Sequence, residues 1–581
     1  MSIEPTNPSG VFLWARSGGG HRTAKEGIKQ QKIKEYAAQG KQLDTQTDID
    51  ITGEKVLSCV RIPFLGGLGD IGVRSWDNAQ KNGDLAFLER YAAWGWIGEI
   101  IFYPIVYFRM KWLLQDLKVE PEFVVSTQAF CLNAIMQAMR TVNSQKSWNM
   151  HMHVYLTDMP SKKATHFFPS IRKVTGNDAL KDMITLHAPP PITKKGQSES
   201  DFWEKYCGKI KVITNESFPI RQAFLDTAKL KEKLEKPSVD VAIKLNATGE
   251  ADIIRNGLGT SSAAAYSDTH VTLNIKKEDK LAFLMLGSQP TATSVLEWVR
   301  TFAEESKKPS QNQNYLFLYC GNPQQNSLLE SVNKEITALK AAGKIAPNFN
   351  VVAFTDQSAD EVALLMARSN VSITRSGGAT SMELLELDRA DLPKPANKLV
   401  LIHSEVALAC PKAAPDSTKF AQTIAAEVAI HMANKRLLCS PEFKAVKQQM
   451  IQHAIELGYS KEQASLLVNN ILEHYIYSDK NAPKESLEDI IKDMAEHAKK
   501  LSPESRPARK MIEAQMRKMQ TKEQYKQHDL CQLRKLAIER VLIKKGIVLW
   551  EGGNAKYLAN KIGAHVTNPL YAKSLLKDSF F

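Results

Sequence analysis

The sequence predicts an α/β fold with two parallel sheets, each flanked by helices, followed by an all-helical extension. From Gly10 to about Lys435, short apolar runs alternate with helical stretches and fall into two sets, a spacing typical of βαβ units. Beyond Ser440 the pattern changes to charged helices with few strand signals. A chain of 581 residues is also too long for one hydrophobic core, so we expect several domains.

The first expected domain covers residues 1–225. Its clearest predicted strands are 11–15, 123–127, 154–158 and 211–214. These runs are apolar and too short for helices, so they indicate buried strands of a parallel sheet. The segment TDIDITG (47–53) stands where the second strand of the first βαβ unit belongs.

The second expected domain covers residues 226–439, and residues 440–581 form the helical extension. The predicted strands of the second domain are 282–287, 315–321, 350–354, 371–374 and 398–403. An insert at about 232–272 contains a stretch rich in Gly, Ser and Ala and is interpreted as part of an interdomain connection. Within it, Gly257–Ala263 resembles the phosphate loop of small-molecule kinases of the galactokinase and mevalonate kinase type. Nothing else in the chain supports a kinase, so we expect a flexible loop there.

The composition is that of a globular protein, with 43% hydrophobic and 24% charged residues. The net charge of +13 favours anionic partners without distinguishing lipid surfaces, nucleic acid and phosphorylated substrates. Seven cysteines are scattered without a CxxC pair, which indicates neither a zinc site nor a disulfide framework and favours a reducing compartment. The first ten residues lack the features of a signal peptide, so we expect a cytoplasmic protein.

A glycine-rich loop, Ser17 to His21, follows the first predicted strand and leads directly into a helix. Gly18, Gly19 and Gly20 allow the backbone to approach a ligand, and the helix N-terminus presents free N–H groups to an anion or polar substrate. A tight βα turn without a ligand is the alternative interpretation. His21 favours a site, because an imidazole in this position can take a proton from an attacking hydroxyl near neutral pH.

A matching loop in the second domain, Thr374 to Glu383, again combines a strand end, glycines and a helix start. Its amides are suited to hold a diphosphate, and the carboxylate of Glu383, a turn or so into the helix, is suited to bind a ribose diol. The alternative for Glu383 is an ordinary solvated helix residue.

In these motifs and in their order the chain resembles the GT-B glycosyltransferases, the group that includes lipid II N-acetylglucosaminyltransferase and monogalactosyldiacylglycerol synthase. Seven segments carry the resemblance: SGGGHRTA (17–24), EPEFVVST (120–127), LTDMP (156–160), FPIR (218–221), GSQ (287–289), YCGN (319–322) and ITRSGGATSMELLEL (373–387). The resemblance implies two Rossmann-like domains facing a cleft. It also implies transfer of a sugar from a nucleotide-diphosphate donor, a UDP-sugar in the related enzymes, to a hydroxyl of a lipid or protein acceptor. The expected transfer inverts the anomeric centre and needs neither metal nor cofactor.

The resemblance also implies roles for individual residues. His21 becomes the general base, and Asp158 its partner or an acceptor-binding carboxylate; a strand-end cap is the alternative role for Asp158. On the donor side, Arg221 and Ser288 are expected at the diphosphate, Glu383 at the ribose and the backbone of Phe354 at the uracil. The full expected donor set is Arg221, Ser288, Gln289, Phe354, Arg375, Ser376, Gly377, Gly378, Thr380 and Glu383.

One segment departs from the family pattern, and a metal-motif look-alike and two other functions also have to be considered. Where the lipid II enzyme reads the sugar with a glutamine pair, this chain has Pro415–Phe420 (PDSTKF), so the sugar is not predicted. Asp48-Ile49-Asp50 has the DxD form of a metal-binding motif, but it lies in a predicted strand, so we expect no metal site. Two other functions also remain open, a nucleotide-sugar epimerase on the same fold and a non-catalytic nucleotide-binding or RNA-binding protein.

Residues 91–114 combine aromatic and aliphatic residues with a basic end. Glu99 and Pro104 interrupt the segment, so we do not expect a transmembrane helix. It is either a kinked core helix or an interfacial patch for peripheral contact with an anionic membrane, as in the related enzymes. The basic helices of the extension are usually solvated faces, so nucleic acid is not the expected partner. Such a module also suits a transferase that modifies a protein acceptor, for example a bacterial effector in a host cell.

Overall fold

The computed structural model divides the chain into two units, Met1–Glu405 with Ile547–Phe581, and Val406–Gly546. It describes residues 8–16, 19–43, 45–63, 65–162, 164, 167–193, 196–214, 220–260, 262, 264–306, 312–323, 327–393, 398–405, 506–522 and 530–580, with isolated positions in 447–468 and at 525 and 528. In the second unit, helices α19 (Arg506–Gln520) and α20 (Leu530–Gly546) pack against each other. All features below belong to the first unit.

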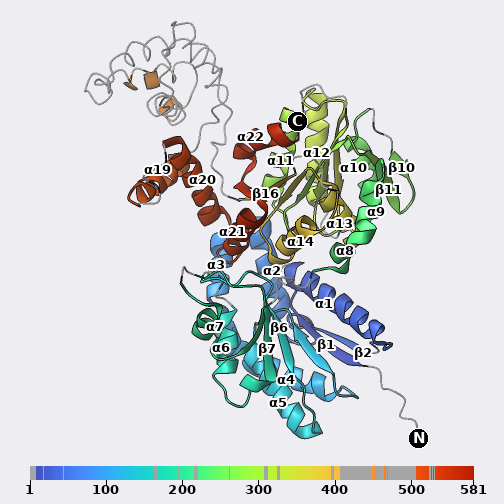
Figure 1. The fold of residues 1–581 in the computed structure, drawn as a ribbon, viewed down its shortest axis with the longest axis vertical. Coiled ribbons are helices and arrows are strands. Elements are labelled where there is room, and N and C mark those ends of the chain that lie inside the picture. The colour runs from blue at the N-terminus through green and yellow to red at the C-terminus, as the bar shows by residue number, and fades with distance from the viewer. Residues whose placement is uncertain are drawn as a thin grey trace. The chain divides into compact units, whose positions relative to one another are not determined.

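The first parallel sheet has six strands in the order β2-β1-β5-β6-β7-β8. Its strands are β1 (Ser9–Trp14), β2 (Thr45–Asp50), β5 (Phe123–Ser126), β6 (Met152–Tyr155), β7 (Ile184–Ala188) and β8 (Lys211–Thr214). The flanking helices are α1 (Gly19–Ala38), α5 (Leu132–Lys146), α6 (Phe168–Thr175) and α7 (Glu199–Cys207), and Figure 1 shows them beside the strands. The predicted strands 11–15, 123–127 and 211–214 are confirmed as β1, β5 and β8, and TDIDITG begins within β2. Strand β6 begins and ends earlier than the predicted 154–158, and β7 was not among the predicted strands.

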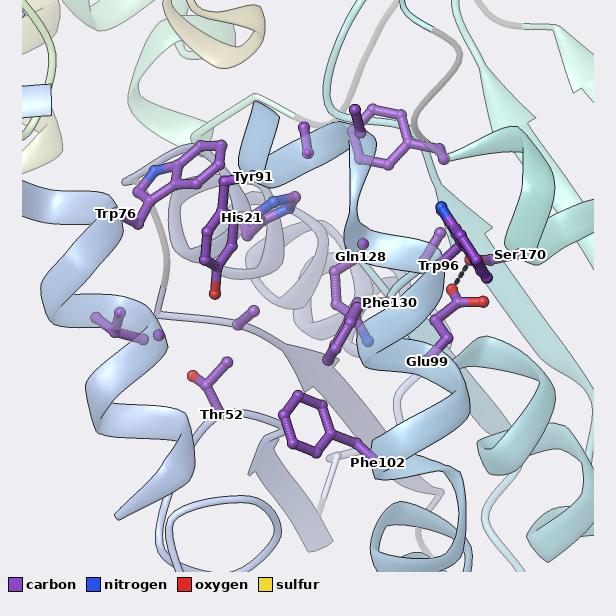
Figure 2. Close-up of a pocket in the computed structure, with 18 of the residues that line it drawn as sticks. His21, Thr52, Trp76, Tyr91, Trp96, Glu99, Phe102, Gln128, Phe130 and Ser170 are labelled. Atoms are coloured by element: carbon purple, nitrogen blue, oxygen red, sulfur yellow. Dashed lines mark hydrogen bonds between the residues drawn. The ribbon is translucent and has the colours of Figure 1, made fainter. Parts of the chain in front are cut away.

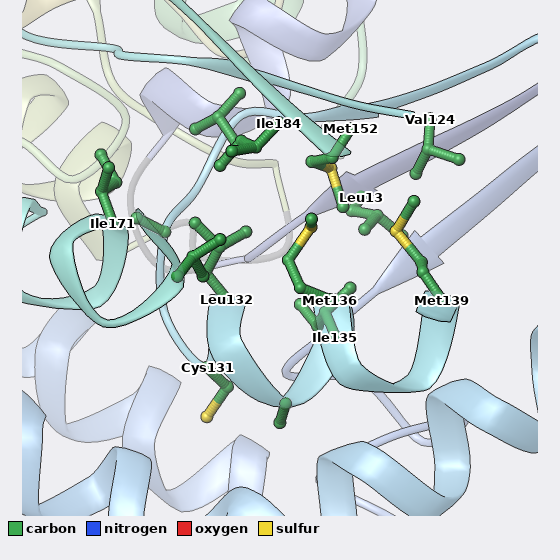
Figure 3. Packing of buried hydrophobic residues seen from close by; sticks show 14 of the residues in the cluster. Leu13, Val124, Cys131, Leu132, Ile135, Met136, Met139, Met152, Ile171 and Ile184 are labelled. Atoms are coloured by element: carbon green, nitrogen blue, oxygen red, sulfur yellow. The ribbon is translucent and has the colours of Figure 1, made fainter. Parts of the chain in front are cut away.

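The core of this domain forms where α5 packs on the sheet. Leu132, Ile135 and Met139 have no exposed surface, and Figure 3 shows α5 turning these side chains toward Leu13 and Met152 of the strands. Burial of these side chains fixes the strands, and therefore the loops at their carboxyl ends.

The second parallel sheet has the order β14-β13-β12-β15-β16-β17. Its strands are β12 (Lys280–Met285), β13 (Asn314–Tyr319), β14 (Phe349–Phe354), β15 (Val371–Thr374), β16 (Leu399–His403) and β17 (His565–Thr567). Its helices are α11 (Ala292–Glu305), α12 (Ser327–Ala341), α13 (Ala359–Arg368), α14 (Gly378–Arg389) and α22 (Pro569–Ser579). The expected α/β fold with two Rossmann-like domains is thereby confirmed.

The end of the chain differs from the expected all-helical extension over 440–581. Strand β17 pairs in parallel with β16, with Leu401 opposite His565, and α22 places Leu576 and Phe580 in the core of the second domain. Helix α21 (Glu551–Ile562) precedes β17. A strand of three residues carries no periodic signal, which is why the sequence pattern does not reveal it.

The insert at 232–272 is a structured subdomain rather than a loose connection. Strands β9 (Ser238–Lys244), β10 (Ala264–Tyr266) and β11 (His270–Lys276) form an antiparallel sheet, and α8 (Gln222–Leu225), α9 (Thr227–Glu235) and α10 (Glu250–Gly257) complete the region. The expected flexible loop packs against the second domain: Gly259 N donates to Asn350 Oδ1 at 2.7 Å. A Cβ on Gly257 would lie 1.9 Å from the Val351 carbonyl oxygen, so close backbone packing accounts for this glycine. Ser261 and Ala263 lie outside the described residues.

Residues 68–115 form a helical layer on the first domain, consisting of α2 (Leu68–Lys81), α3 (Leu85–Ala93) and α4 (Gly95–Gln115), preceded by the short strands β3 (Arg61–Ile62) and β4 (Gly66–Gly67). One face of α4 is buried on α5 through Val106, Met110 and Leu114. The opposite face exposes Trp96, Ile100, Pro104, Phe108 and Trp112, four residues apart along the helix. Within the described parts of the chain, no helix has the length and apolar character needed to cross a membrane.

Candidate functional site

Each sheet has one topological switch point, where neighbouring strands lead to connections on opposite sides. In the first sheet it lies between β1 and β5, and in the second between β12 and β15. Ligands of open α/β sheets bind in the crevice outside the carboxyl ends of such strands. The glycine-rich loop with His21 follows β1, Ser288 follows β12, and Arg375 to Gly378 follow β15. The structure therefore brings the sequence-predicted loops to the two switch points.

His21 is held in one tautomer by the strand beside it. Its Nδ1 lies 2.6 Å from the carbonyl oxygen of Thr127, and the Thr127 hydroxyl donates to the His21 carbonyl at 3.0 Å. Since a carbonyl only accepts, Nδ1 carries the hydrogen and Nε2 is the proton-accepting nitrogen. Burial lowers the pKa of His21, although the bond to Thr127 opposes this. The ring is therefore neutral at pH 7 and chemically able to act as a base.

The loop before His21 touches the second domain. Gly19 N donates to Ser288 Oγ at 3.1 Å, and a Cβ on Gly19 would lie 3.0 Å from the Ser288 Cβ. Gly20 has open space where a Cβ would be, and Gly18 lies outside the described residues. Of the three glycines, only Gly19 is thus shown at a close approach, and its neighbour is Ser288.

Asp158, which follows β6, caps the helix of the second glycine loop. Its carboxylate accepts from the backbone N–H of Gly378 and from Asn554 Nδ2 at 3.0 Å. Burial raises the pKa of Asp158 to about 6 against these two hydrogen bonds. A Cβ on Gly378 would lie 1.5 Å from the Thr157 carbonyl oxygen. Gly378 therefore allows close contact between the two domains, and an anionic side chain occupies the N-terminus of α14.

Arg221 and Glu383, both expected donor contacts, bind each other. Arg221 Nε and Nη2 donate to the two carboxylate oxygens of Glu383 at 2.7 and 2.9 Å. Glu383 has no exposed surface and Arg221 is mostly buried. Such a bidentate pair is rigid and directional, so in this conformation the structure gives Glu383 an arginine partner instead of a free carboxylate for a ribose. Phe218 and Pro219 of the same motif lie outside the described residues.

Arg375 is likewise engaged within the second domain. Its Nε donates to Glu405 at 3.0 Å, and its Nη1 donates to the Gln289 carbonyl at 3.3 Å. This arginine ties the loop after β15 to the loop after β12. The Ser376 carbonyl accepts from Asn554 Nδ2 at 2.7 Å.

The other expected donor residues vary in accessibility. Gly377 and Thr380 are half-buried at the start of α14. The Phe354 side chain is fully buried against Phe283 at a ring distance of 6.4 Å, and its carbonyl accepts from Cys320 N at 2.8 Å. Pro415–Phe420, where the sugar-reading residues were expected, lie outside the described residues.

A cavity of about 450 Å³ opens beside His21 in the first domain. Its walls are mostly aromatic and aliphatic, and His21 and Asp158 belong to its lining. Figure 2 shows His21 with Trp76, Tyr91 and Phe130 around the same space. Glu99 from α4 also reaches it, where Ser170 donates to Glu99 Oε1 and Lys173 Nζ lies 3.1 Å from Oε2. Burial raises the pKa of Glu99 against the opposing effect of Lys173.

The C-terminal segment adds site residues that the sequence pattern did not single out. Trp550 stacks on Trp76 with ring centroids 5.8 Å apart. Asn554 binds Asp158, the Ser376 carbonyl and Met159 N. Burial raises the pKa of Glu551 to about 7, and the nearby Asp158 charge adds to this while Arg375 opposes it. The helical charge pattern of the extension is interrupted at LWEGGN (549–554). This interruption is the sequence signal that could have identified these site residues.

The residues of the DxD motif are engaged in ion pairs. Asp48 lies 3.3 Å from Lys25 and from Lys29, and Asp50 lies 2.6 Å from Arg16. Among the residues that the structure describes, no group of three His, Cys, Asp or Glu side chains is arranged to hold a metal ion.

Comparison with known proteins finds similarity only among solved structures. No protein-family model and no curated protein matches the chain. MurG of Acinetobacter baumannii matches with 11% identity over 84% of this chain and 99% of its own, at a TM-score of 0.31. A UDP-forming α,α-trehalose-phosphate synthase from Burkholderia xenovorans matches with 11% identity over 68% of this chain and 84% of its own, at a TM-score of 0.37. The fold assignment therefore rests on the strand order and pairing of the chain itself.

Proposed function

We propose that this protein is a glycosyltransferase that moves a sugar from a nucleotide-diphosphate donor, a UDP-sugar first, to an acceptor hydroxyl. The observation that carries the proposal is the contact between loops at the carboxyl ends of the two sheets, Gly19 with Ser288 and Asp158 with Gly378. This arrangement combines a neutral histidine beside an apolar cavity in one domain with an anion-binding helix N-terminus in the other.

In the proposal the donor diphosphate binds at the N-terminus of α14. The Asp158 carboxylate already occupies this N-terminus, as expected for a position with a positive helix dipole and N–H groups. The diphosphate replaces that carboxylate when the donor enters. Arg221 and Arg375 are paired with Glu383 and Glu405, so the helix N-terminus supplies most of the charge that stabilises the leaving group. The proposed transfer needs no cofactor and no metal ion.

The proposed reaction is a single displacement with inversion. The acceptor oxygen forms a bond to the anomeric carbon while the bond from that carbon to the phosphate oxygen breaks, and the nucleoside diphosphate leaves with the electron pair. The acceptor proton passes to Nε2 of His21, because Nδ1–H is held by the Thr127 carbonyl. Closure of the two domains around the reacting groups excludes water.

We further propose that α4 contacts an anionic membrane surface. The stripe from Trp96 to Trp112 is apolar and exposed, and Trp96 also lines the cavity beside His21. The guanidinium of Arg109 lies over the Trp112 ring at 5.2 Å, which puts a cation beside the apolar stripe. Aromatic residues with neighbouring cations are suited to the boundary between headgroups and acyl chains.

The test measures nucleoside diphosphate release from UDP-, GDP- and ADP-sugars by the wild type, His21→Ala and a control, His270→Ala, which changes a histidine of β11. We expect slow release from one donor, lost by about 10²- to 10⁴-fold in His21→Ala and retained in the control. Conversion of the free donor sugar without an acceptor would instead identify an epimerase. Failure to bind any donor would overturn the proposal and favour a binding role for the basic helices.

A further inference from the structure

The cavity beside His21 contains a buried amide without hydrogen-bond partners. Gln128 is 3% exposed and follows directly after Thr127, the residue that orients His21. Within the described chain, neither its amide nitrogen nor its amide oxygen is hydrogen-bonded. Figure 2 shows this side chain among those that line the cavity. Buried side-chain amides are nearly always paired, so this amide is positioned for a ligand.

A second unpaired polar atom lines the same cavity. The indole Nε1 of Trp76 is buried and makes no hydrogen bond to any described residue. Its ring is fixed by Trp550 at 5.8 Å and by Tyr91 at 5.8 Å. These two side chains thus offer the cavity two unpaired donors, Gln128 Nε2 and Trp76 Nε1, and one unpaired acceptor, Gln128 Oε1.

The charges around the cavity exclude an anionic ligand group. Its described lining contains Glu89, Glu99 and Asp158 and no lysine or arginine. Lys173 lies against Glu99 and compensates that carboxylate rather than a ligand. A phosphate or carboxylate placed here would lose its hydration without gaining a cation, which is a large penalty.

The walls favour a mostly apolar molecule of moderate size. Aromatic rings of Trp96, Phe102, Phe130 and Phe167 supply much of the surface. The volume of about 450 Å³ lies within the range of small-molecule sites. Trp96 lines the cavity and also belongs to the exposed stripe of α4, so exposed apolar surface adjoins the cavity.

We propose that this cavity binds an uncharged, mainly apolar molecule with a hydroxyl group next to an amide or a second hydroxyl, and that Gln128 selects it. The amide of Gln128 pairs with both the donor and the acceptor of that group, and Trp76 donates to a further oxygen. The role of this molecule as the sugar acceptor rests on the proposed function. Its binding to the cavity does not depend on that function. In the acceptor role, its hydroxyl lies beside Nε2 of His21.

The experiment measures equilibrium binding to the full-length protein by calorimetry. Two neutral probes separate the possible sources, N-octanoylethanolamine for an alkyl ligand and 2-hydroxyphenylacetamide for an aromatic one, and octyl phosphate is the anionic counterpart. We expect at least one neutral probe to bind, and octyl phosphate to bind at least about tenfold more weakly than N-octanoylethanolamine. Equal or tighter binding of octyl phosphate would overturn the proposal, as would no binding of either neutral probe.

Two variants test the residues directly. Gln128→Leu removes both amide contacts and is expected to weaken the bound neutral probe about tenfold or more, while Gln39→Leu, the same change at an exposed position, leaves binding unchanged. Trp76→Phe keeps an aromatic ring but removes the N–H, for a loss of roughly three- to tenfold. Its control is Trp148→Phe, the same change at a half-buried tryptophan that does not line the cavity. If Gln128→Leu does not fold, Trp76→Phe still tests whether the buried polar groups of the cavity bind the probe. Unchanged binding in the folded cavity variants contradicts the assignment. If the protein turns over a donor but binds neither neutral probe, this inference is wrong and the proposed function stands. If it binds a neutral probe but turns over no donor, only the proposed function is wrong.

Discussion

Replacing Gly378 with alanine tests the contact between the two glycine-loop domains. The added Cβ would lie 1.5 Å from the Thr157 carbonyl oxygen, whereas ordinary contacts begin at 3.4 Å, so the two backbones must part by about 2 Å. That movement breaks the hydrogen bond from Gly378 N to Asp158. Overpacking costs about 1–3 kcal/mol and a hydrogen bond to a charged group about 1.5–3 kcal/mol. Alanine returns at most about 1 kcal/mol of helix propensity.

We therefore expect Gly378→Ala to lower the free energy of unfolding by about 1.5–6 kcal/mol. Urea denaturation followed by tryptophan fluorescence measures this, and hydrogen exchange of residues 155–160 reports the opened contact. Gly20→Ala is the matched control, because a Cβ there meets nothing within 4 Å at the start of α1, and it is expected to be neutral or slightly stabilising. If Gly378→Ala is as stable as Gly20→Ala, the close approach of the two domains is wrong.

Three further predictions concern other buried polar groups. Arg221→Met leaves the Glu383 carboxylate buried without its partner and should cost about 3–5 kcal/mol in urea denaturation; the double variant with Glu383→Gln should recover part of this loss. Burial, with neighbouring positive charges, lowers the pKa of His153 and of His187 to about 4, so the unfolded chain binds more protons between pH 6.5 and 4. Their contribution to stability is therefore present above pH 6.5 and lost as the pH falls toward 4, by up to about 1.4 kcal/mol per pH unit for each group, which denaturation at pH 7.5 and 5 would reveal. Asn554→Leu removes the side-chain bonds to both domains, and hydrogen exchange at 374–380 should then accelerate.

Much of the fold could be predicted from the sequence because the strands are short, apolar and flanked by turn residues. The runs that became β5, β13 and β15 are almost entirely buried, so hydrophobicity alone marks them. The glycine loops were predictable for the same reason, since each follows such a strand and begins a helix. Two parallel sheets then place these loops at their switch points.

The remainder depends on contacts between distant residues. Glu383 is recognisable as a carboxylate in a helix, but its bidentate bond to Arg221 joins residues 162 positions apart. Asn554 is hydrogen-bonded to Asp158, 396 positions away in the sequence. The residues before Asn554 have a helical charge pattern, so the sequence does not indicate that the chain then adds a strand to the second sheet. No sequence pattern singles out Gln128, because its unpaired amide becomes apparent only when the folded chain forms the cavity around it.

The insert between the domains illustrates a different difficulty. Its strands β9 and β11 alternate buried and exposed residues, a pattern typical of an antiparallel sheet. The nearby glycines and serines suggested a connection, yet Gly257 is required by its contact with Val351. Glycines and serines therefore occur both in flexible connections and in closely packed segments, and only the structure shows which of the two this segment is.

Hydrogen exchange with saturating UDP, GDP or ADP is the decisive test of whether a nucleotide-sugar donor binds at the switch point of the second sheet. We predict that the nucleotide that binds slows exchange in the first turn of α14, Gly378–Ser381, and in the loop after β12, residues 286–290. Exchange at Asp158 and Met159 should become faster, because the diphosphate displaces the Asp158 carboxylate from α14. Binding that leaves both donor segments unchanged, or that protects only the insert at 232–272, would contradict the account.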